Sequence, residues 1–236
     1  MTFPLIFHYK YSVDSTNIWA KKLKDDRFIH VLYAGYQTAG RGRHHRKWIS
    51  SPGKNILMTI KHDHLLPQIQ PNFYSLIAAY TIIKLLNQLD IDTYFKWPND
   101  IWTKNGKLCG ILPESIWYGQ TIKKIILGIG LNVNEDNFPK ALQATSLFIE
   151  SGKKYNIHKL VRAISELYVR NIFEPMQNII DYLWEKFIWK NQQVILIPDG
   201  IKGTPQGINQ KGHLIIQKNN GSTVEVIWGE ITLRKI

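Results

Sequence analysis

A strongly basic tract between residues 40 and 48 holds the side chains with the most evident chemistry. It reads Gly-Arg-Gly-Arg-His-His-Arg-Lys-Trp and contains no acidic residue. Arginine offers a planar fork of donors that suits phosphate, and glycine lets the backbone approach a ligand closely because it lacks a Cβ. These residue types predict a loop that a bound polyanion orders and closes as a lid. A solvated basic loop or a nucleic-acid contact is equally compatible with the tract alone.

Three further stretches carry polar or glycine residues in patterns that suit a ligand site. Lys-Trp-Pro-Asn-Asp at 96–100 places a cation, an amide and a carboxylate around a rigid proline corner. Lys107 starts an apolar stretch in which Gly110 permits close approach. Gly-Ile-Gly-Leu-Asn at 128–132 predicts a strand whose glycines expose backbone hydrogen-bonding groups. Each stretch alone is also typical of an ordinary turn or strand.

Segments rich in β-branched and aromatic residues predict the strands that must hold these side chains. In the first part of the chain, strands are expected at 5–11, 31–36, 55–61, 93–96, 100–103, 108–115 and 122–131. The basic tract follows the second strand directly. Between the fifth and sixth, Asn105 and Gly106 can take the positive φ angles of a hairpin turn. Pro113 lacks a backbone donor and is therefore expected at a sheet edge or a bulge.

Apolar residues at helical spacing predict the helices. The first follows a cap at Asp14 or Ser15 and carries Ile18, Trp19 and Leu23. The other helices are expected at 73–89, 157–173 and 178–189.

The chain changes character near residue 190. Beyond it, short strands are expected at 194–197, 203–208, 213–217, 223–228 and 231–234, a pattern typical of a small barrel. From residue 191 onward there are five Lys and Arg against three Asp and Glu, a surplus of two, so most of the net charge of +12 belongs to the first part. We predict an α+β domain with a mixed sheet at 1–190 and a small β domain at 191–236.

Composition excludes several classes of protein. The 236 residues are 44% hydrophobic and 12% aromatic, which is ample for a packed core and excludes a disordered chain. No apolar run approaches the ~20 residues of a membrane span, and the first residues lack the pattern of a secretory signal. The single cysteine, Cys109, excludes an intrachain disulfide, fits a cytoplasmic protein and is expected to be a small packed residue. The charge favours anionic partners without identifying them.

Taken together, these stretches resemble the biotin protein ligases, the biotin–[acetyl-CoA-carboxylase] ligases. The matching motifs, in the family's order, are Ser-Thr-Asn at 15–17, Gln-Thr-Ala-Gly-Arg-Gly-Arg at 37–43, Lys-Trp-Pro-Asn-Asp at 96–100, Lys-Leu-Cys-Gly-Ile-Leu at 107–112 and Gly-Ile-Gly-Leu-Asn at 128–132. Trp-Gly-Glu-Ile-Thr-Leu-Arg at 228–234 looks like the end of the family's SH3-like domain. The resemblance covers essentially the whole chain and implies a class II synthetase-like catalytic domain followed by a small SH3-like β-barrel.

The resemblance implies ATP-dependent attachment of biotin to a protein lysine. In the family, biotin and ATP give biotinyl-5′-AMP and pyrophosphate, and an acceptor lysine then displaces AMP. ATP and Mg²⁺ are the implied cofactors, and the biotin carboxyl carrier domain of acetyl-CoA carboxylase or a similar enzyme is the implied partner. Free sheet edges are the expected surface for the acceptor and for a possible homodimer. Because the Ser-Thr-Asn motif begins at Ser15, we expect no N-terminal helix-turn-helix domain and no specific DNA binding.

The resemblance also implies roles for individual residues. Lys107, Arg41 and Asp100 are implied for catalysis, with Asp100 orienting or deprotonating the acceptor lysine. The residues implied for biotin binding are Ser15, Thr16, Asn17, Gln37, Gly40, Arg41, Gly42, Arg43, Lys107, Gly128 and Gly130. The residues implied for ATP or AMP binding are Arg41, Arg43, Trp48, Lys96, Asn99 and Asn132. The ligands of Mg²⁺ stay unassigned.

Two residues depart from the family pattern, and two other functions stay open. His45 stands where the family often has glycine, which predicts a stiffer or differently closed lid, and Pro113 replaces a usual aliphatic residue. A lipoate or octanoate ligase or transferase of the same fold is the second candidate, and a basic nucleic-acid-binding protein is the third. His-Asp-His at 62–64 invites a metal interpretation, but a polar loop after a strand is favoured because no third ligand cluster is evident.

Overall fold

The computed structural model describes residues 4–63, 70–227 and 232–236, apart from the side chains of His45 and Thr121. The expected effect of His45 on the lid, the histidine at position 64 and the motif residues 228–231 therefore lie outside the described part of the chain.

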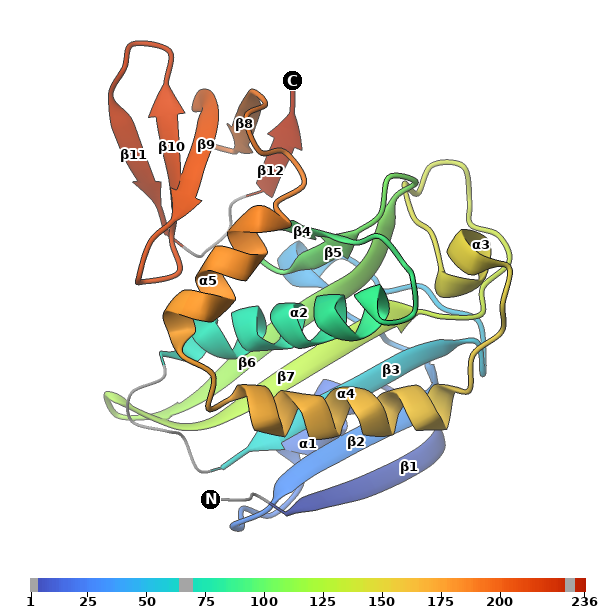
Figure 1. The fold of residues 1–236 in the computed structure, drawn as a ribbon. Coiled ribbons are helices and arrows are strands. Elements are labelled where there is room, and N and C mark those ends of the chain that lie inside the picture. The colour runs from blue at the N-terminus through green and yellow to red at the C-terminus, as the bar shows by residue number, and fades with distance from the viewer. Residues whose placement is uncertain (1–3, 64–69, 228–231) are drawn as a thin grey trace.

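A mixed seven-stranded sheet forms the larger part of the molecule, with strand order β1-β2-β3-β7-β6-β5-β4 (Figure 1). Its strands are β1 (Leu5–Val13), β2 (Ile29–Gln37), β3 (Asn55–His62), β4 (Tyr94–Lys96), β5 (Asp100–Trp102), β6 (Lys107–Tyr118) and β7 (Thr121–Asn132). β1 and β2 run parallel, and all other neighbouring strands run antiparallel. Each strand covers the segment predicted for it, with ends that differ by a few residues.

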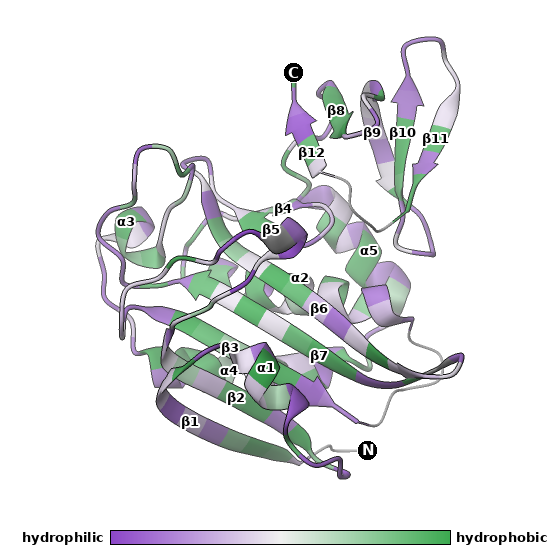
Figure 2. Ribbon diagram, turned by 180° about the vertical axis from the view of Figure 1, so that it is seen from behind, coloured by the Kyte–Doolittle hydropathy of each residue, from purple (hydrophilic) through white to green (hydrophobic). Residues whose placement is uncertain are grey.

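Helices cover the two faces of this sheet unequally. The helices α2 (Pro71–Asn87), α4 (Ile157–Asn171) and α5 (Met176–Glu185) lie on one face (Figure 1). The short α1 (Thr16–Lys21) lies on the other face, against β2, β3 and β7 (Figure 2). α2 is buried along nearly its whole length because it lies between the sheet and the outer helices α4 and α5. No helix within the described ranges has the length and apolarity to cross a membrane.

The alternation of side chains along β7 explains why one face is packed and the other can hold a ligand. Leu127, Ile129 and Leu131 are buried in the main hydrophobic core under α2. Because successive side chains of a strand point to opposite faces, Gly128 and Gly130 face α1. Their missing side chains leave that face open along the middle of the sheet.

A second, five-stranded sheet follows the helices, with strand order β11-β10-β9-β8-β12. Its strands are β8 (Val194–Ile197), β9 (Lys202–Ile208), β10 (Leu214–Lys218), β11 (Thr223–Val226) and β12 (Thr232–Lys235). The turn between β9 and β10 contacts the larger part of the molecule at the corner after β4 and at the start of α2. The Trp97 indole donates to the backbone oxygen of Gly212 at 3.1 Å, and Asn72 donates to that of Lys211 at 2.7 Å.

Several local predictions need correction. The last helix ends at Glu185 and not at residue 189, because the chain from Lys186 onward pairs with β4 instead, through a bridge between Phe187 and Phe95. Ser15 occupies the N-cap of α1, but its side chain makes no capping hydrogen bond. At the hairpin after β5, only the glycine, Gly106, has a positive φ. The helices α3 (Leu147–Ser151) and η1 (Arg43–His45) were not predicted.

Two other local predictions are confirmed. Pro113 pairs with Leu127 of β7, whereas the pairing of β6 with β5 runs only from Lys107 to Gly110. Among the described residues, β6 therefore has a strand neighbour on only one side at Pro113. This edge position suits proline, which lacks the backbone N–H that a second neighbour would need. Cys109 is fully buried in the core, and burial raises the pKa of its thiol, which suits a packed residue and not a nucleophile.

His62, part of the segment that invited a metal interpretation, is a core residue at the end of β3. Its ring packs against the rings of Tyr74 and Tyr168 at centroid distances of 5.3 and 5.4 Å, and its Nε2 has no hydrogen-bond partner in the described residues. Burial lowers the pKa of His62 from 6.5 to about 3. The imidazole is therefore neutral in the folded protein and becomes protonated when the protein unfolds in mild acid.

We expect His62→Phe to reduce the acid sensitivity of folding. Between pH 6.5 and 3 the unfolded chain binds one more proton at His62, so the stability from this group is present above pH 6.5 and is lost as the pH falls. This contribution should cost the wild type about 2 kcal/mol of unfolding free energy between pH 7 and pH 5. Urea unfolding at both values measures it. An identical pH dependence of the two proteins would contradict the assignment.

Candidate active site

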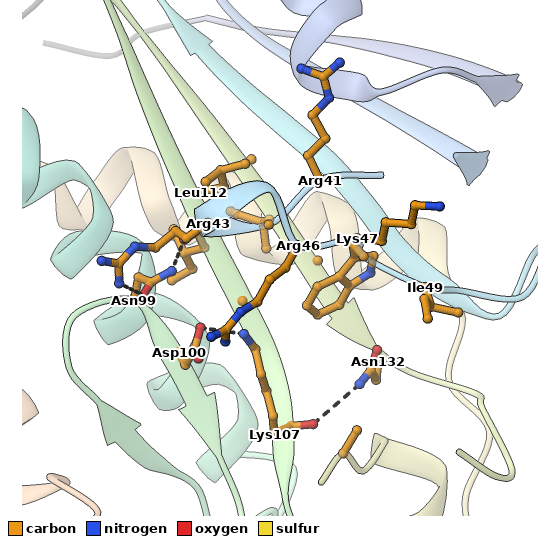
Figure 3. A pocket seen from close by; sticks show the side chains of 18 of the residues that line it. Arg41, Arg43, Arg46, Lys47, Ile49, Asn99, Asp100, Lys107, Leu112 and Asn132 are labelled. Carbon is orange, nitrogen blue, oxygen red and sulfur yellow. Dashed lines mark hydrogen bonds and ion pairs between the residues drawn. The ribbon is translucent and has the colours of Figure 1, made fainter. Parts of the chain in front are cut away.

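A cavity of about 300 Å³ opens on the α1 face of the larger sheet (Figure 3). Strands β3, β6 and β7 supply its floor, and α1 with the end of β2 supplies one wall. The basic segment, defined here as residues 41–49, covers it. The corner between β4 and β5, the start of β12 and the loop after β7, at Phe138 and residues 142–144, also line it. Both sheets therefore contribute to one site.

The cavity collects the predicted site residues from across the chain. Those that line it are Ser15, Thr16, Asn17, Gln37, Arg41, Gly42, Arg43, Trp48, Lys96, Asn99, Asp100, Lys107, Gly128, Gly130 and Asn132. Gly40 does not line it and packs within its own loop, where a Cβ would lie 2.7 Å from the backbone oxygen of Trp48. Residues that are far apart in sequence therefore share one enclosed space, although their individual roles stay predictions.

At one end of the cavity, a buried network of polar side chains surrounds the start of α1. The side-chain oxygen of Gln37 accepts from the backbone N–H of Thr16 at 2.7 Å and from its hydroxyl at 3.0 Å. Both bonds engage the oxygen of Gln37. Within the described part of the chain its NH₂ group has no hydrogen-bond partner and can therefore donate to a ligand. Ser15 and Thr16 are both buried, so the polar atoms here are desolvated before any ligand binds.

Asn17 is held from both sides in the same network. Its Oδ1 accepts from the Thr59 hydroxyl at 2.6 Å, and its Nδ2 donates to Glu114 at 2.6 Å. Glu114 in turn accepts from Lys21 at 2.8 Å. A Cβ on Gly128 would lie only 2.5 Å from Asn17 Oδ1, so this glycine is required by the close approach of the asparagine.

Thr59 and Glu114 belong to this network but were not predicted from the sequence. Thr59 is completely buried in β3, and its Oγ1 lies within hydrogen-bonding distance of both Thr16 and Asn17. It is the one polar residue in the run Ile-Leu-Met-Thr-Ile at 56–60, and that interruption of an apolar strand was a usable signal. The local sequence gave no comparable signal for Glu114, because its partners come from α1.

Charged groups gather at the other end of the cavity, around the corner between β4 and β5. Lys107 donates to Asp100 Oδ1 at 2.7 Å, and both side chains are mostly buried. Arg43 donates to Asn99 Oδ1 at 2.9 Å, while Asn99 donates to the backbone oxygen of Ile111 at 2.6 Å. Burial lowers the pKa of Arg43, and the carboxylate of Asp100 opposes that effect. The result is a partly dry, positively charged end of the cavity.

The arginines of the basic segment point in different directions. Figure 3 shows the Arg46 side chain directed toward Asp100 and Lys107, and Arg43 directed toward Asn99, whereas Arg41 points away from them. Arg46 belongs to the tract that the sequence singled out, but no role was predicted for it. Its place in the cavity makes it a third cation beside the Lys107 ammonium.

Trp48 and Asn132 lie on the floor near Lys107. A Cβ on Gly130 would come within 2.5 Å of the Trp48 indole, and one on Gly110 within 3.0 Å, so the ring lies flush on two glycines. Lys107 Nζ lies 5.7 Å from the centre of this ring. Asn132 donates to the backbone oxygen of Thr145 at 2.9 Å and so fixes the neighbouring loop. This floor offers a flat apolar surface beside a cation.

Comparison with known proteins decides the family. The sequence profile of the biotin/lipoate A/B protein ligase family matches residues 9–132, more than half of the chain. The chain belongs to this family. The bifunctional ligase/repressor BirA of Bacillus spizizenii is 30% identical over 90% of this chain and 70% of its own length. The biotin–[acetyl-CoA-carboxylase] ligase of Mycobacterium tuberculosis is 28% identical over 85% of this chain and 77% of its own.

The solved structures agree with this assignment. The biotin protein ligase of Aquifex aeolicus, in complex with biotin and ATP, has a TM-score of 0.81 and 27% identity, and the match covers 99% of both chains. The resemblance to the biotin protein ligases within the biotin/lipoate ligase family is therefore confirmed. So is the predicted fold class, a mixed sheet with helices followed by a small separate β-sheet.

Proposed function

We propose that the chain uses ATP to activate biotin as biotinyl-5′-AMP and then transfers biotin to a lysine of a carrier protein. The observation that carries this proposal is that one cavity has a buried polar network at one end and a cluster of cations at the other. Such a cavity suits an intermediate that joins a compact polar ring and an apolar chain to a phosphate. The family and its named relatives point to the same chemistry.

Pyrophosphate release tests the proposal. The purified chain is mixed with ATP and Mg²⁺, and biotin or lipoate is supplied. We expect release with biotin, and biotin transfer when a biotin carboxyl carrier domain is then added. Release with lipoate and none with biotin would instead assign the chain to the lipoate-specific branch of the family. Binding of nucleic acid that weakens steeply with salt, with no pyrophosphate release, would favour the third candidate.

We assign the network around α1 to the ureido ring of biotin. This ring presents both donors and acceptors, and unpaired buried polar groups cost about 1–3 kcal/mol each. Thr16 and Asn17 supply such groups from buried positions, and Gln37 supplies them from a half-buried one. Ser15 and the backbone at Gly128 line the same region, whereas Gly130, the next residue along the same face of β7, lies under Trp48.

We assign the cationic end to the reacting carboxylate and phosphate. As the biotin carboxylate attacks the α-phosphate, negative charge concentrates there, and preorganised cations lower the barrier. Lys107 is already held by Asp100, and Arg43 by Asn99, so these groups need little reorganisation. Arg41 points away from these groups in Figure 3, so its proposed role requires its side chain to turn toward the ligand. The neighbouring Gly42 lets the backbone approach that ligand closely. Trp48 and Asn132 are the proposed adenine side.

Asp100 is also the proposed residue for the transfer step. An incoming lysine has an unperturbed pKa of ~10.4 and arrives mostly protonated. Among the described residues that line the cavity, Asp100 is the one carboxylate, and it lies at the corner between β4 and β5, where we propose that the acceptor enters. We propose that it orients this amine or accepts its proton. Unchanged transfer from preformed adenylate by Asp100→Ala would refute the role.

We propose that Mg²⁺ enters the site bound to the phosphates of ATP. Within the described residues there is no group of three or more His, Cys, Asp or Glu that could hold a metal ion. That arrangement fits Mg²⁺, which is usually held by one or two carboxylates together with substrate phosphates. Asp100 is the carboxylate that the described part of the chain brings to this cavity, and bound Mg²⁺ would help to neutralise the phosphates.

The proposal extends to the organisation and the partner of the chain. We propose two domains at 1–190 and 191–236, joined by the contact between Trp97 and Gly212. The name of the Mycobacterium tuberculosis relative supports a biotin carboxyl carrier domain as acceptor. The single cysteine supports a reducing, cytoplasmic location. The free edge of β1 is the proposed surface for a homodimer.

Thr59→Val should weaken biotin binding selectively. The substitution keeps the shape of the side chain but removes the hydroxyl that links Thr16 and Asn17. Leaving one buried acceptor unpaired costs about 1–3 kcal/mol, so the KM for biotin should rise roughly tenfold while the KM for ATP changes little. Thr81→Val, which alters an equally buried threonine in α2, is the matched control. Equal changes in both KM values would argue against the assignment of this network to biotin.

A further inference from the structure

Lys96 lies between two indole rings at the edge of the cavity. Its Nζ is 4.2 Å from the ring centre of Trp102 and 4.8 Å from that of Trp189. The two rings are themselves 6.5 Å apart and tilted by 57°. Lys96 lines the cavity, whereas neither tryptophan does. The two rings, called here the indole pair, thus contact the Lys96 ammonium from the side away from the cavity.

Two separate parts of the chain build the indole pair. Lys96 in β4 is paired with Asp100 in β5, and Trp102 lies two residues further along β5, so all three side chains share one face of the sheet. Trp189 comes from the segment after α5. Ile188 donates its backbone N–H to the oxygen of Phe95 at 3.0 Å, and this bond brings Trp189 beside Lys96.

This arrangement is more than a surface lysine covering apolar groups. A lysine that merely covers apolar surface keeps its ammonium in water, whereas burial here lowers the pKa of Lys96 to about 8. Asp100 opposes that effect, and Lys107, Arg46 and Arg234 add to it. A desolvated ammonium among other cations is costly unless aromatic faces or an anionic ligand offset the loss of water. The surrounding charges point to an anionic ligand.

We propose that Trp102 and Trp189 are positioning residues that hold the Lys96 ammonium toward the phosphates of ATP, so that the segment after α5 helps to build the phosphate end of the site. This inference rests on the proposed function. It assigns a task to two aromatic residues that do not themselves touch the cavity, one of them outside the seven-stranded sheet. Lys96 is the group that contacts the ligand.

The experiment uses the full chain and a set of matched variants. Trp189→Leu removes one aromatic face, and Trp189→Phe keeps a smaller one. Trp184→Leu is the control, because Trp184 lies in the nearby α5 and also carries a lysine, Lys190, over its ring at 5.4 Å. Lys96→Gln removes the charge from an intact indole pair and identifies the Lys96 signal in an NMR titration of labelled lysine side chains.

We expect Trp189→Leu to raise the KM for ATP roughly fivefold with a change in kcat of less than about twofold, because the cation is no longer fixed. In the wild type the KM for ATP should rise above pH 8 as Lys96 loses its proton. In Trp189→Leu the midpoint of the Lys96 titration, and with it this rise, should move further below about 8, because leucine keeps the site apolar but removes a ring face that stabilises the charged ammonium. Trp189→Phe should stay close to the wild type, and Trp184→Leu should show neither change.

Several outcomes would overturn the inference. One is a Lys96 titration that is the same in the wild type and Trp189→Leu, and another is an equal rise in KM in Trp184→Leu. If Trp189→Leu does not fold, Lys96→Gln decides, and an unchanged KM for ATP in that variant rejects a role in phosphate binding. If the wild type releases no pyrophosphate with biotin, the proposed function fails separately, while the titration still decides whether the indole pair holds the ammonium.

Discussion

Lys107→Met is expected to lower the rate of biotin-dependent pyrophosphate release by about 10²-fold or more. The estimate follows from the effect of removing one preorganised donor from a site where negative charge develops. Lys107 is suited to that task because Asp100 fixes its ammonium at 2.7 Å, and Arg43 and Arg46 line the same end of the cavity. The loss should appear mainly in kcat, since the interaction strengthens as the α-phosphate is attacked.

A matched control separates this effect from a change in net charge or stability. Lys54→Met also removes a lysine that is paired with an aspartate, here Asp136 at 3.0 Å, but Lys54 does not line the cavity. The ion pair of Lys54 lies at the surface, where such pairs contribute little to stability, so this control should fold. Single-turnover formation of biotinyl-5′-AMP is the measurement. Activity of Lys107→Met within a few-fold of Lys54→Met would remove Lys107 from the chemical step.

Local sequence patterns were sufficient to predict most elements of this fold. The strands carry β-branched and aromatic runs bounded by Gly, Pro and Asn, and these features act over short distances in the chain. The five strands after residue 190 all lie where they were expected, as far as the described residues reach. The α2 segment was evident as a long apolar helix because it is buried on all sides.

The features that could not be predicted depend on contacts between segments that are far apart in the sequence. The predicted last helix was extended to Trp189 because the apolar spacing continues, but pairing of residues 186–188 with Phe95 ends it at Glu185. The strand order, and the parallel pairing of β1 with β2, likewise depend on tertiary packing. Glu114 was missed for the same reason, because its partner Asn17 is distant in sequence.

The sequence was sufficient to predict which residues form the candidate site, but not how their side chains are oriented. Motif residues carry rare combinations of glycine, cation and amide, and every site residue predicted from them except Gly40 lines the cavity. Other lining residues, such as Arg46 and Phe138, were not predicted. Their orientations required the structure. Arg41 and Arg46 have the same chemical group in the same tract, but only Arg46 points toward Lys107 in Figure 3.

The two glycines of β7 should distinguish the two halves of the site. In Gly128→Ala the new Cβ would lie 2.5 Å from Asn17 Oδ1, closer than any real contact allows. Asn17 cannot move away without losing its bonds to Thr59 and Glu114, each 2.6 Å long. Loss of two buried hydrogen bonds, at about 1–3 kcal/mol each, should raise the KM for biotin by roughly 30-fold or more.

Gly130→Ala is expected to act on the other substrate. Its Cβ would lie 2.5 Å from the Trp48 indole and would lift that ring from the floor of the cavity, so the KM for ATP should rise and the KM for biotin should change much less. Gly207→Ala, at a position with open space around it, controls for the loss of a strand glycine. The KM for each substrate, measured in all three variants, tests the assignment. Gly128 and Gly130 are successive residues on the same face of β7. If Gly128→Ala raised mainly the KM for ATP and Gly130→Ala mainly the KM for biotin, the two substrates would occupy the ends of the cavity opposite to those proposed.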